Sequence, residues 1–138
     1  MTTDPVALGL PHREPFQFVD AVIEHHPGVS ATCIKSFPAS DPVFRGHFPG
    51  NPIVPGVLLT EALAQTAGIA AAVQSGPLLL SAIRGMKFFG AVRPDEPLTL
   101  RATVVKTVGP LWQFDVSAEC AGKKVADGQV VLSEGAQP

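Results

Sequence analysis

The chain has 138 residues, of which 46% are apolar and only 16% are charged, and its formal net charge is −2. This length suits one domain, which we expect to span residues 1–138 with a sizeable core. The small, interspersed charge excludes the basic footprint of a nucleic-acid-binding protein. No apolar run reaches the roughly 20 residues of a membrane-spanning helix, so we expect no membrane partner.

The N-terminus and the cysteines indicate a cytoplasmic protein. The first 15 residues lack the basic start and apolar stretch of a secretory signal peptide. Cys33 and Cys120 lie far apart and lack a metal-type spacing. We therefore expect two reduced thiols in a cytoplasmic location.

Two strands are predicted before a proline-rich loop. Residues 16–24 and 29–37 have strand-like composition and are separated by a turn at Pro27 and Gly28. The segment 38–55 holds five prolines and two glycines. It predicts an irregular loop, with one short helical turn after Asp41.

One long helix is predicted next, from about residue 55 to about residue 74. The segment is rich in Ala and Leu, and Pro55 fits a first helical position. Gly76 and Pro77 would end the helix. Because the helix is apolar nearly all round, we expect a sheet to wrap it.

Four closely spaced strands are predicted after the helix. Their short turns favour antiparallel pairing, so the fold class is α+β. We expect the first of them to be bent or bulged near Gly85. In the third, Trp112, Phe114, Val116 and Ala118 alternate with more polar residues. The four strands are predicted at residues 78–90, 97–109, 111–121 and 124–134.

Glu61 is a charge that this apolar helix does not explain. Among the residues three and four positions away only Gln65 is polar, and the others are Val57, Leu58 and Ala64. Burying a carboxylate there without partners would cost on the order of several kcal/mol. We favour a carboxyl group in a water-poor site where it exchanges protons; the alternative is a solvated stripe on a surface helix.

His47 is the histidine with the best case for chemistry. Gly46 and Gly50 flank it and allow close backbone approach, and three prolines stiffen the path to the helix. Neutral imidazole is the usual general base near pH 7. The alternative for a lone loop histidine is a structural role.

The start of the helix lacks a capping side chain. Val54, Gly56 and Val57 offer no acceptor, so the first N–H groups are free to bind the oxygen of a carbonyl. A histidine, a carboxyl group and such a helix end together suit removal of a proton beside a carbonyl, because the enolate-like charge is stabilised.

The remaining histidines are assigned structural or solvent roles. His12 stands beside Arg13, and His25 and His26 lie at a predicted strand end. No histidine has cysteines or carboxylates at metal-ligand spacing, so we expect no zinc site. No phosphate loop or dinucleotide fingerprint occurs, so we expect no nucleotide cofactor.

Three stretches resemble the 3-hydroxyacyl-acyl-carrier-protein dehydratases of type II fatty acid synthesis, which have the hot-dog fold. They read LPHREPFQFVDAV, DPVFRGHFPGNPIVPGVLLTEALAQTAG and KFFGAVRPDEPLTL. The resemblance covers about Leu10 to about Arg101. It implies a six-stranded antiparallel sheet around one long central helix, a homodimer with a continuous sheet, and often a trimer of dimers.

The resemblance also implies the site residues. The catalytic histidine falls on His47 and the catalytic acid on Glu61, which meet across the dimer interface. The amide that polarises the thioester carbonyl falls on Gly56, and Gln65 would orient Glu61. An acyl tunnel is implied along the interface, and the expected substrate-binding residues are Phe48, Ile53, Val54, Val57, Gln65, Phe88 and Phe89.

The implied reaction converts a (3R)-3-hydroxyacyl thioester on acyl-carrier protein to a trans-2-enoyl thioester. Glutamate at position 61 is typical of the branch of this family that lacks isomerase activity, so the resemblance implies a dehydratase without that activity. Acyl-carrier protein is acidic, so a basic rim is expected. Its candidates are Arg84, Lys87, Arg93 and Arg101.

Three alternatives stay open. One is an acyl thioesterase of the same fold, which would not require His47. Another is a dehydratase of a polyketide or aryl-polyene pathway. The third is a non-catalytic partner of a paired dehydratase, which would have no need of both His47 and Glu61.

Overall fold

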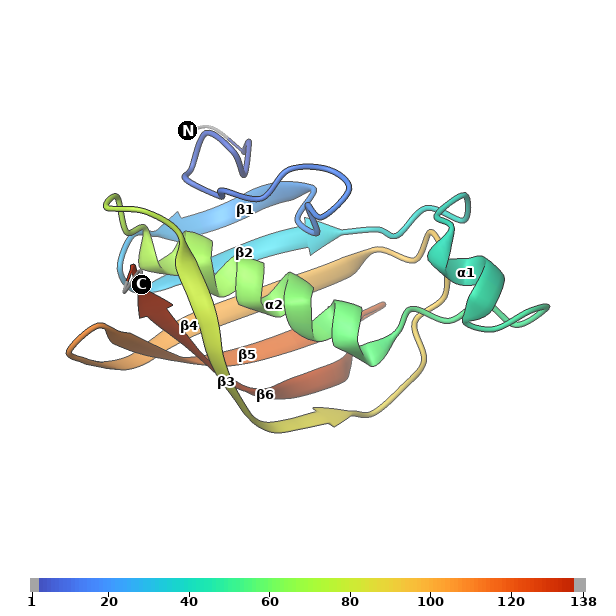
Figure 1. Ribbon diagram of the computed structural model, residues 1–138. Coiled ribbons are helices and arrows are strands. Elements are labelled where there is room, and N and C mark those ends of the chain that lie inside the picture. The colour runs from blue at the N-terminus through green and yellow to red at the C-terminus, as the bar shows by residue number, and fades with distance from the viewer. Residues whose placement is uncertain (1–2, 136–138) are drawn as a thin grey trace.

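One long helix lies along a six-stranded antiparallel sheet that wraps around it (Figure 1). The computed structural model describes residues 3–135. The strand order in the sheet is β1-β2-β4-β5-β6-β3. This is the predicted α+β hot-dog arrangement, which is confirmed. The elements are β1 (Ala21–His26), β2 (Ser30–Lys35), α1 (Val43–Gly46), α2 (Gly56–Ala71), β3 (Leu78–Phe88), β4 (Leu98–Val108), β5 (Leu111–Cys120) and β6 (Lys123–Glu134).

Helix α2 forms the centre of the core. Eleven of its sixteen residues are buried, among them Leu63 and Ile69. This burial on nearly every side explains why the sequence of the helix has no polar stripe. Within residues 3–135, neither helix is long and apolar enough to cross a membrane.

The end of α2 was predicted three residues too late. Ala72 adopts a left-handed conformation with φ of 55° and donates its N–H to the Gly68 carbonyl, which closes the helix. Two of the last carbonyls of α2 have partners in and beside the β1–β2 turn: the Gly28 N–H of the turn donates to Ala70, and Nε2 of His25 in β1 lies 2.8 Å from the Ile69 oxygen. His25 therefore has a structural contact, as expected.

Strand β1 begins five residues later than predicted. The N–H of Phe18 donates to Gln65 Oε1 over 2.8 Å, and the carbonyl of Phe16 accepts from Gln65 Nε2 over 2.9 Å. A helix side chain thus binds main-chain groups that a strand would use, and residues 16–20 run as an irregular segment. Sequence alternation does not reveal such a competitor.

The short helical turn and the bulge were predicted correctly. Asp41 Oδ1 accepts from the Val43 N–H at the start of α1. In β3 the register against β6 shifts between Arg84 and Lys87, around Gly85 with φ of 57°. The opposing residue is Gly128, where a Cβ would lie 2.7 Å from Met86 Cα, so the bulge requires glycine there.

Strand β3 is an edge strand that pairs only with β6. Several of its large apolar side chains are exposed, although an unpaired apolar edge is a liability for an isolated chain. The exposed residues are Leu79, Leu80, Ile83 and Phe88.

Candidate active site

Main-chain hydrogen bonds hold His47 in front of α2. Its N–H donates to the Val43 carbonyl over 3.1 Å, and its own carbonyl accepts from the Ile53 N–H over 2.9 Å. The ring Nδ1 lies 2.9 Å from the Ile53 oxygen. Because a carbonyl oxygen only accepts, Nδ1 carries the hydrogen and Nε2 keeps its lone pair. In its neutral form, the ring therefore presents Nε2 as an acceptor.

The amino end of α2 has free donors. Pro55 precedes the helix and no side chain caps it. Within residues 3–135, the N–H groups of Gly56 and Val57 have no acceptor. Gly56 faces the Phe88 ring so closely that a Cβ would lie 3.1 Å from two ring atoms. This helix end can bind a carbonyl oxygen, as the uncapped sequence predicts.

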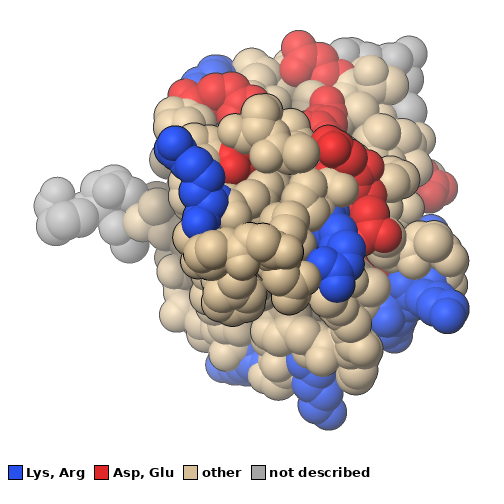
Figure 2. All heavy atoms as spheres, turned by 90° about the vertical axis from the view of Figure 1, so that its right-hand side faces the viewer, with Lys and Arg blue, Asp and Glu red and all other residues tan. Residues whose placement is uncertain are grey.

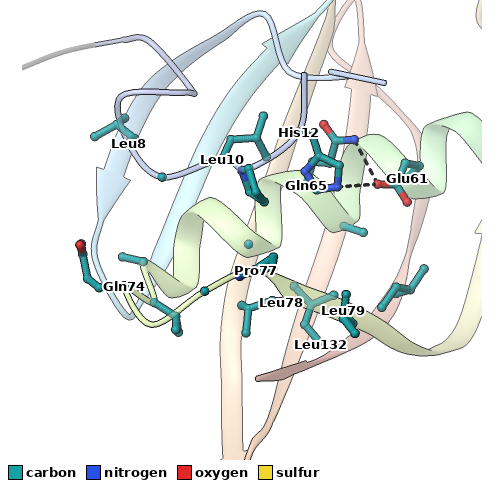
Figure 3. A pocket seen from close by; sticks show the side chains of 18 of the residues that line it. Leu8, Leu10, His12, Glu61, Gln65, Gln74, Pro77, Leu78, Leu79 and Leu132 are labelled. Carbon is teal, nitrogen blue, oxygen red and sulfur yellow. Dashed lines mark hydrogen bonds and ion pairs between the residues drawn. The ribbon is translucent and has the colours of Figure 1, made fainter. Parts of the chain in front are cut away.

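Glu61 is held from two elements. Its Oε2 accepts from Gln65 Nε2 over 3.0 Å and lies 3.6 Å from His12 Nε2. Figure 3 shows both contacts reaching the same oxygen. The Glu61 side chain is 19% exposed, so the carboxyl group lies in a partly enclosed position. A solvated surface stripe is excluded, because Gln65 is 1% exposed and Ala62 is fully buried.

These polar groups lie at one end of an apolar cavity of about 440 Å³ (Figure 3). The cavity runs between the N-terminal segment, the rest of α2 and the start of β3. It combines one acidic group with walls that suit an acyl chain. Its apolar lining includes Leu8, Leu10, Phe16, Ala64, Leu78, Leu79, Leu80 and Leu132.

The structure separates the predicted site residues into two groups. Gly56 and Glu61 are five residues apart, so Glu61 points about 140° away around α2 and lies about 7.5 Å further along it. His47 does not line the cavity that holds Glu61 and Gln65. Within a single chain, His47 is therefore not part of the cavity that Glu61 lines.

The predicted substrate-binding residues other than Gln65 lie outside this cavity, at or near the amino end of α2. Phe48 and Phe88 are each 48% exposed, Phe89 is 57% exposed and Val57 is 75% exposed. Ile53 is half-buried, and Val54 is 3% exposed, so its side chain is already covered by its own core.

His12 is a site residue that sequence reasoning missed. It was assigned a structural or solvent role, yet it lines the cavity and its Nε2 faces Glu61. The one feature in the sequence that could have drawn attention to His12 is its place between two prolines in LPHREP. That feature does not show which side chain the ring contacts. His26 does lie at the surface, where it contacts Glu24.

Figure 2 shows the end of the molecule that carries α1 and the amino end of α2. Lys and Arg side chains flank an uncharged centre, and acidic side chains gather on the upper side. Arg93 binds Asn51 Oδ1 over 2.8 Å, close to the His47 loop. Arg101 lies elsewhere and pairs with Glu119. Arg93 is thus one of the four residues expected on the basic rim, and it contacts the loop that carries His47.

The described residues contain no group of three or more His, Cys, Asp and Glu residues that could hold a metal. Both cysteines are free thiols. Burial raises the pKa of Cys33 to about 11, despite a hydrogen bond with Thr66. Such a thiol is a poor nucleophile near neutral pH.

A family model described as a FabA-like domain matches residues 10–129. A curated relative from Ruminiclostridium cellulolyticum, named 3-hydroxyacyl-acyl-carrier-protein dehydratase FabZ, is 45% identical, and the match covers 94% of each chain. A relative of the same name from Thiobacillus denitrificans is 37% identical, over 96% of this chain and 97% of its own.

The solved structures show the shared fold. A chain of the dehydratase heterocomplex ApeI:P from Xenorhabdus doucetiae has a TM-score of 0.80 at 18% identity, over 97% of this chain and 93% of that one. A hypothetical thioesterase from Streptococcus pneumoniae, solved with coenzyme A, has a TM-score of 0.64 at 12% identity, over 81% and 82% of the two chains. From the match to the family and the identity to its curated relatives, the chain belongs to the FabA-like family.

Proposed function

We propose that this protein dehydrates (3R)-3-hydroxyacyl thioesters of acyl-carrier protein to trans-2-enoyl thioesters in fatty acid biosynthesis. The curated FabZ relatives are named for this reaction. The observation that carries the proposal is that His47 presents a free Nε2 beside an uncapped helix, while α2 also holds a carboxyl group in an apolar cavity. One base, one acid and an N–H donor are the groups that the reaction needs.

Each group then has one role. The N–H of Gly56 donates to the thioester oxygen and stabilises the charge that develops there. Nε2 of His47 takes a proton from the α-carbon. Glu61 gives a proton to the β-hydroxyl group, the C–O bond breaks, and water leaves as the double bond forms. The enzyme returns to its starting state when the proton on His47 is returned to Glu61 through solvent.

The complete site is proposed to form between two copies of the chain. Within one chain, His47 does not line the cavity that holds Glu61, so Glu61 would work with His47 of the partner subunit. The unpaired edge of β3, with its exposed Leu79 and Ile83, supports a homodimer in which two sheets join edge to edge. A trimer of dimers is the further assembly that such a dimer would allow.

The acyl chain would follow the interface into the apolar cavity. Its volume of about 440 Å³ and its leucine-rich wall support this path. At the entrance, exposed or half-buried apolar side chains would contact the acyl chain and the partner subunit. These are Phe48, Ile53, Val57, Phe88 and Phe89.

We also propose a cytoplasmic location, a single domain over residues 1–138, and acyl-carrier protein as the donor. Basic side chains at the end shown in Figure 2 support an acidic carrier, and Arg93 lies against the His47 loop. The free thiols Cys33 and Cys120 fit a reducing compartment.

The test is a dehydration assay of the purified chain with 3-hydroxyacyl thioesters of several lengths, on acyl-carrier protein and on coenzyme A. We expect a product 18 mass units lighter, the mass of one water, which stays attached to its carrier. Release of free acid and thiol would instead identify a thioesterase. No turnover by the chain alone, with turnover after a second subunit is added, would identify a partner of a paired dehydratase.

A further inference from the structure

We propose that His12 is a positioning residue for Glu61: with Gln65 it fixes Oε2, so that Oε1 is the oxygen that delivers the proton. The proposal rests on the proposed function, because it assigns a device to the same acid. It begins from the two contacts in Figure 3, which both reach Oε2.

The tautomer of His12 follows from what surrounds its ring. Within the described residues, Nδ1 of His12 is buried and has no hydrogen-bond partner. A buried N–H without an acceptor is rarer than a buried acceptor without a donor, so the hydrogen belongs on Nε2. His12 Nε2 lies 3.6 Å from Glu61 Oε2, a distance that substrate binding can shorten in a free active site.

The contacts leave the two oxygens of Glu61 in different environments. Oε2 faces two donors, the Gln65 amide and the His12 ring. An oxygen that accepts one hydrogen bond and faces a second donor 3.6 Å away is the poorer site for a proton, so the proposal assigns the acidic hydrogen to Oε1. No other charged or titratable side chain within the described residues pairs with Glu61. In the described part of the cavity lining, Glu61 is the one acidic residue, and the wall is otherwise mostly apolar.

The position of His12 is fixed at both ends of its segment. Leu10 is 2% exposed and belongs to the core. The Arg13 guanidinium folds back onto the carbonyls of Leu10 and His12, at 2.8 and 2.9 Å. Gln65 binds the carbonyl of Phe16, and the same amide group binds Glu61. One side chain therefore links the carboxyl group to the segment that carries His12.

Two variants of the full chain separate a positioning role from a structural one. His12→Gln keeps a donor near the position of Nε2, whereas His12→Asn places its amide near Nδ1. We expect kcat of the Asn variant to fall by about tenfold to hundredfold and kcat of the Gln variant to stay within about threefold of wild type, with KM nearly unchanged in both. His26→Asn is the control, because His26 also faces a glutamate, at 3.1 Å, but on the surface; its kcat should not change.

Equal kcat values for the Gln and Asn variants would overturn the proposal, as would a change in KM alone. Loss of the folded state in both variants, measured by thermal unfolding, would also overturn it, because His12 would then serve the fold. An inactive wild-type chain would refute the proposed function instead, so the two failures are distinguishable.

Discussion

The amino end of α2 and its middle hold their candidate groups by different means. At the amino end, main-chain hydrogen bonds hold His47, and the donors are main-chain N–H groups. The neighbouring aromatic Phe88 is half exposed. In the middle, Glu61 depends on the side chains of Gln65 and His12, which lie at the polar end of a cavity.

This difference indicates what each region can tolerate. Groups held by the main chain keep their position when nearby side chains change, whereas a carboxyl group held by side chains loses it when one partner is removed. It also bears on the proposed homodimer. Apolar surface remains at the amino end of α2 and on β3, where a second chain would cover it.

The largest effect is expected from removing the proposed base and the proposed acid in two separate variants. His47→Ala and Glu61→Gln should each lower kcat at least about 100-fold, because each removes one proton-transfer group. If the site joins two chains, an equimolar mixture of the two variants, unfolded and refolded together, should regain about one quarter of wild-type activity. Half of the dimers are then mixed and each has one intact site. Steady-state dehydration rates measure the recovery.

Each variant refolded alone is the control and should remain inactive. Mixed dimers that form, as native mass spectrometry would show, but stay inactive would mean that the base and the acid act from the same chain.

A smaller effect is expected from Gln65→Leu in the middle of the helix. The change leaves the buried N–H of Phe18 and the carbonyl of Phe16 without their hydrogen-bond partner. The free energy of unfolding should therefore fall by about 2–4 kcal/mol. Activity should also fall, because Glu61 loses a donor. Urea unfolding measures the first effect, with exposed Gln74→Leu as the control. Unchanged stability would contradict the role of Gln65 as a link between α2 and the N-terminal segment.

The smallest effect is expected from Gly56→Ala at the amino end. Its Cβ would press on the Phe88 ring, 3.1 Å away, and that ring must move by a few tenths of an ångström. We expect kcat/KM to fall by about tenfold, because the carbonyl site is disturbed, while the free energy of unfolding changes by less than about 1 kcal/mol. Phe88→Leu in the same chain should restore part of the activity. If Gly56→Ala lowered the free energy of unfolding as much as Gln65→Leu does, the two regions would not differ in how their groups are held.

The sequence was informative about α2 and the strands after it. Apolar residues on all sides of residues 56–71 predicted a helix enclosed by a sheet, because a helix without a polar face must be covered. The alternation in residues 111–121 predicted a strand, and in β5 the side chains of Phe114, Val116 and Ala118 are buried while Trp112 of the same set is half-buried. These patterns reflect local geometry, which neighbours in sequence determine.

The sequence was least informative where contacts join distant parts of the chain. The start of β1 was predicted too early because Gln65, 47 positions after Phe18, binds the main chain there. His12 was assigned no functional contact because its neighbours in sequence do not show that Glu61 lies beside it.

The amino-acid sequence by itself determined the element order, the apolar centre of α2, the uncapped helix start and the types of group available for proton transfer. Only the tertiary structure decided which of those groups meet: Glu61 with Gln65 and His12, and His47 with the Ile53 carbonyl instead of Glu61. The physical reason is that periodicity and capping depend on residues within a turn or two. A hydrogen bond across 49 positions depends on how the sheet closes around the helix.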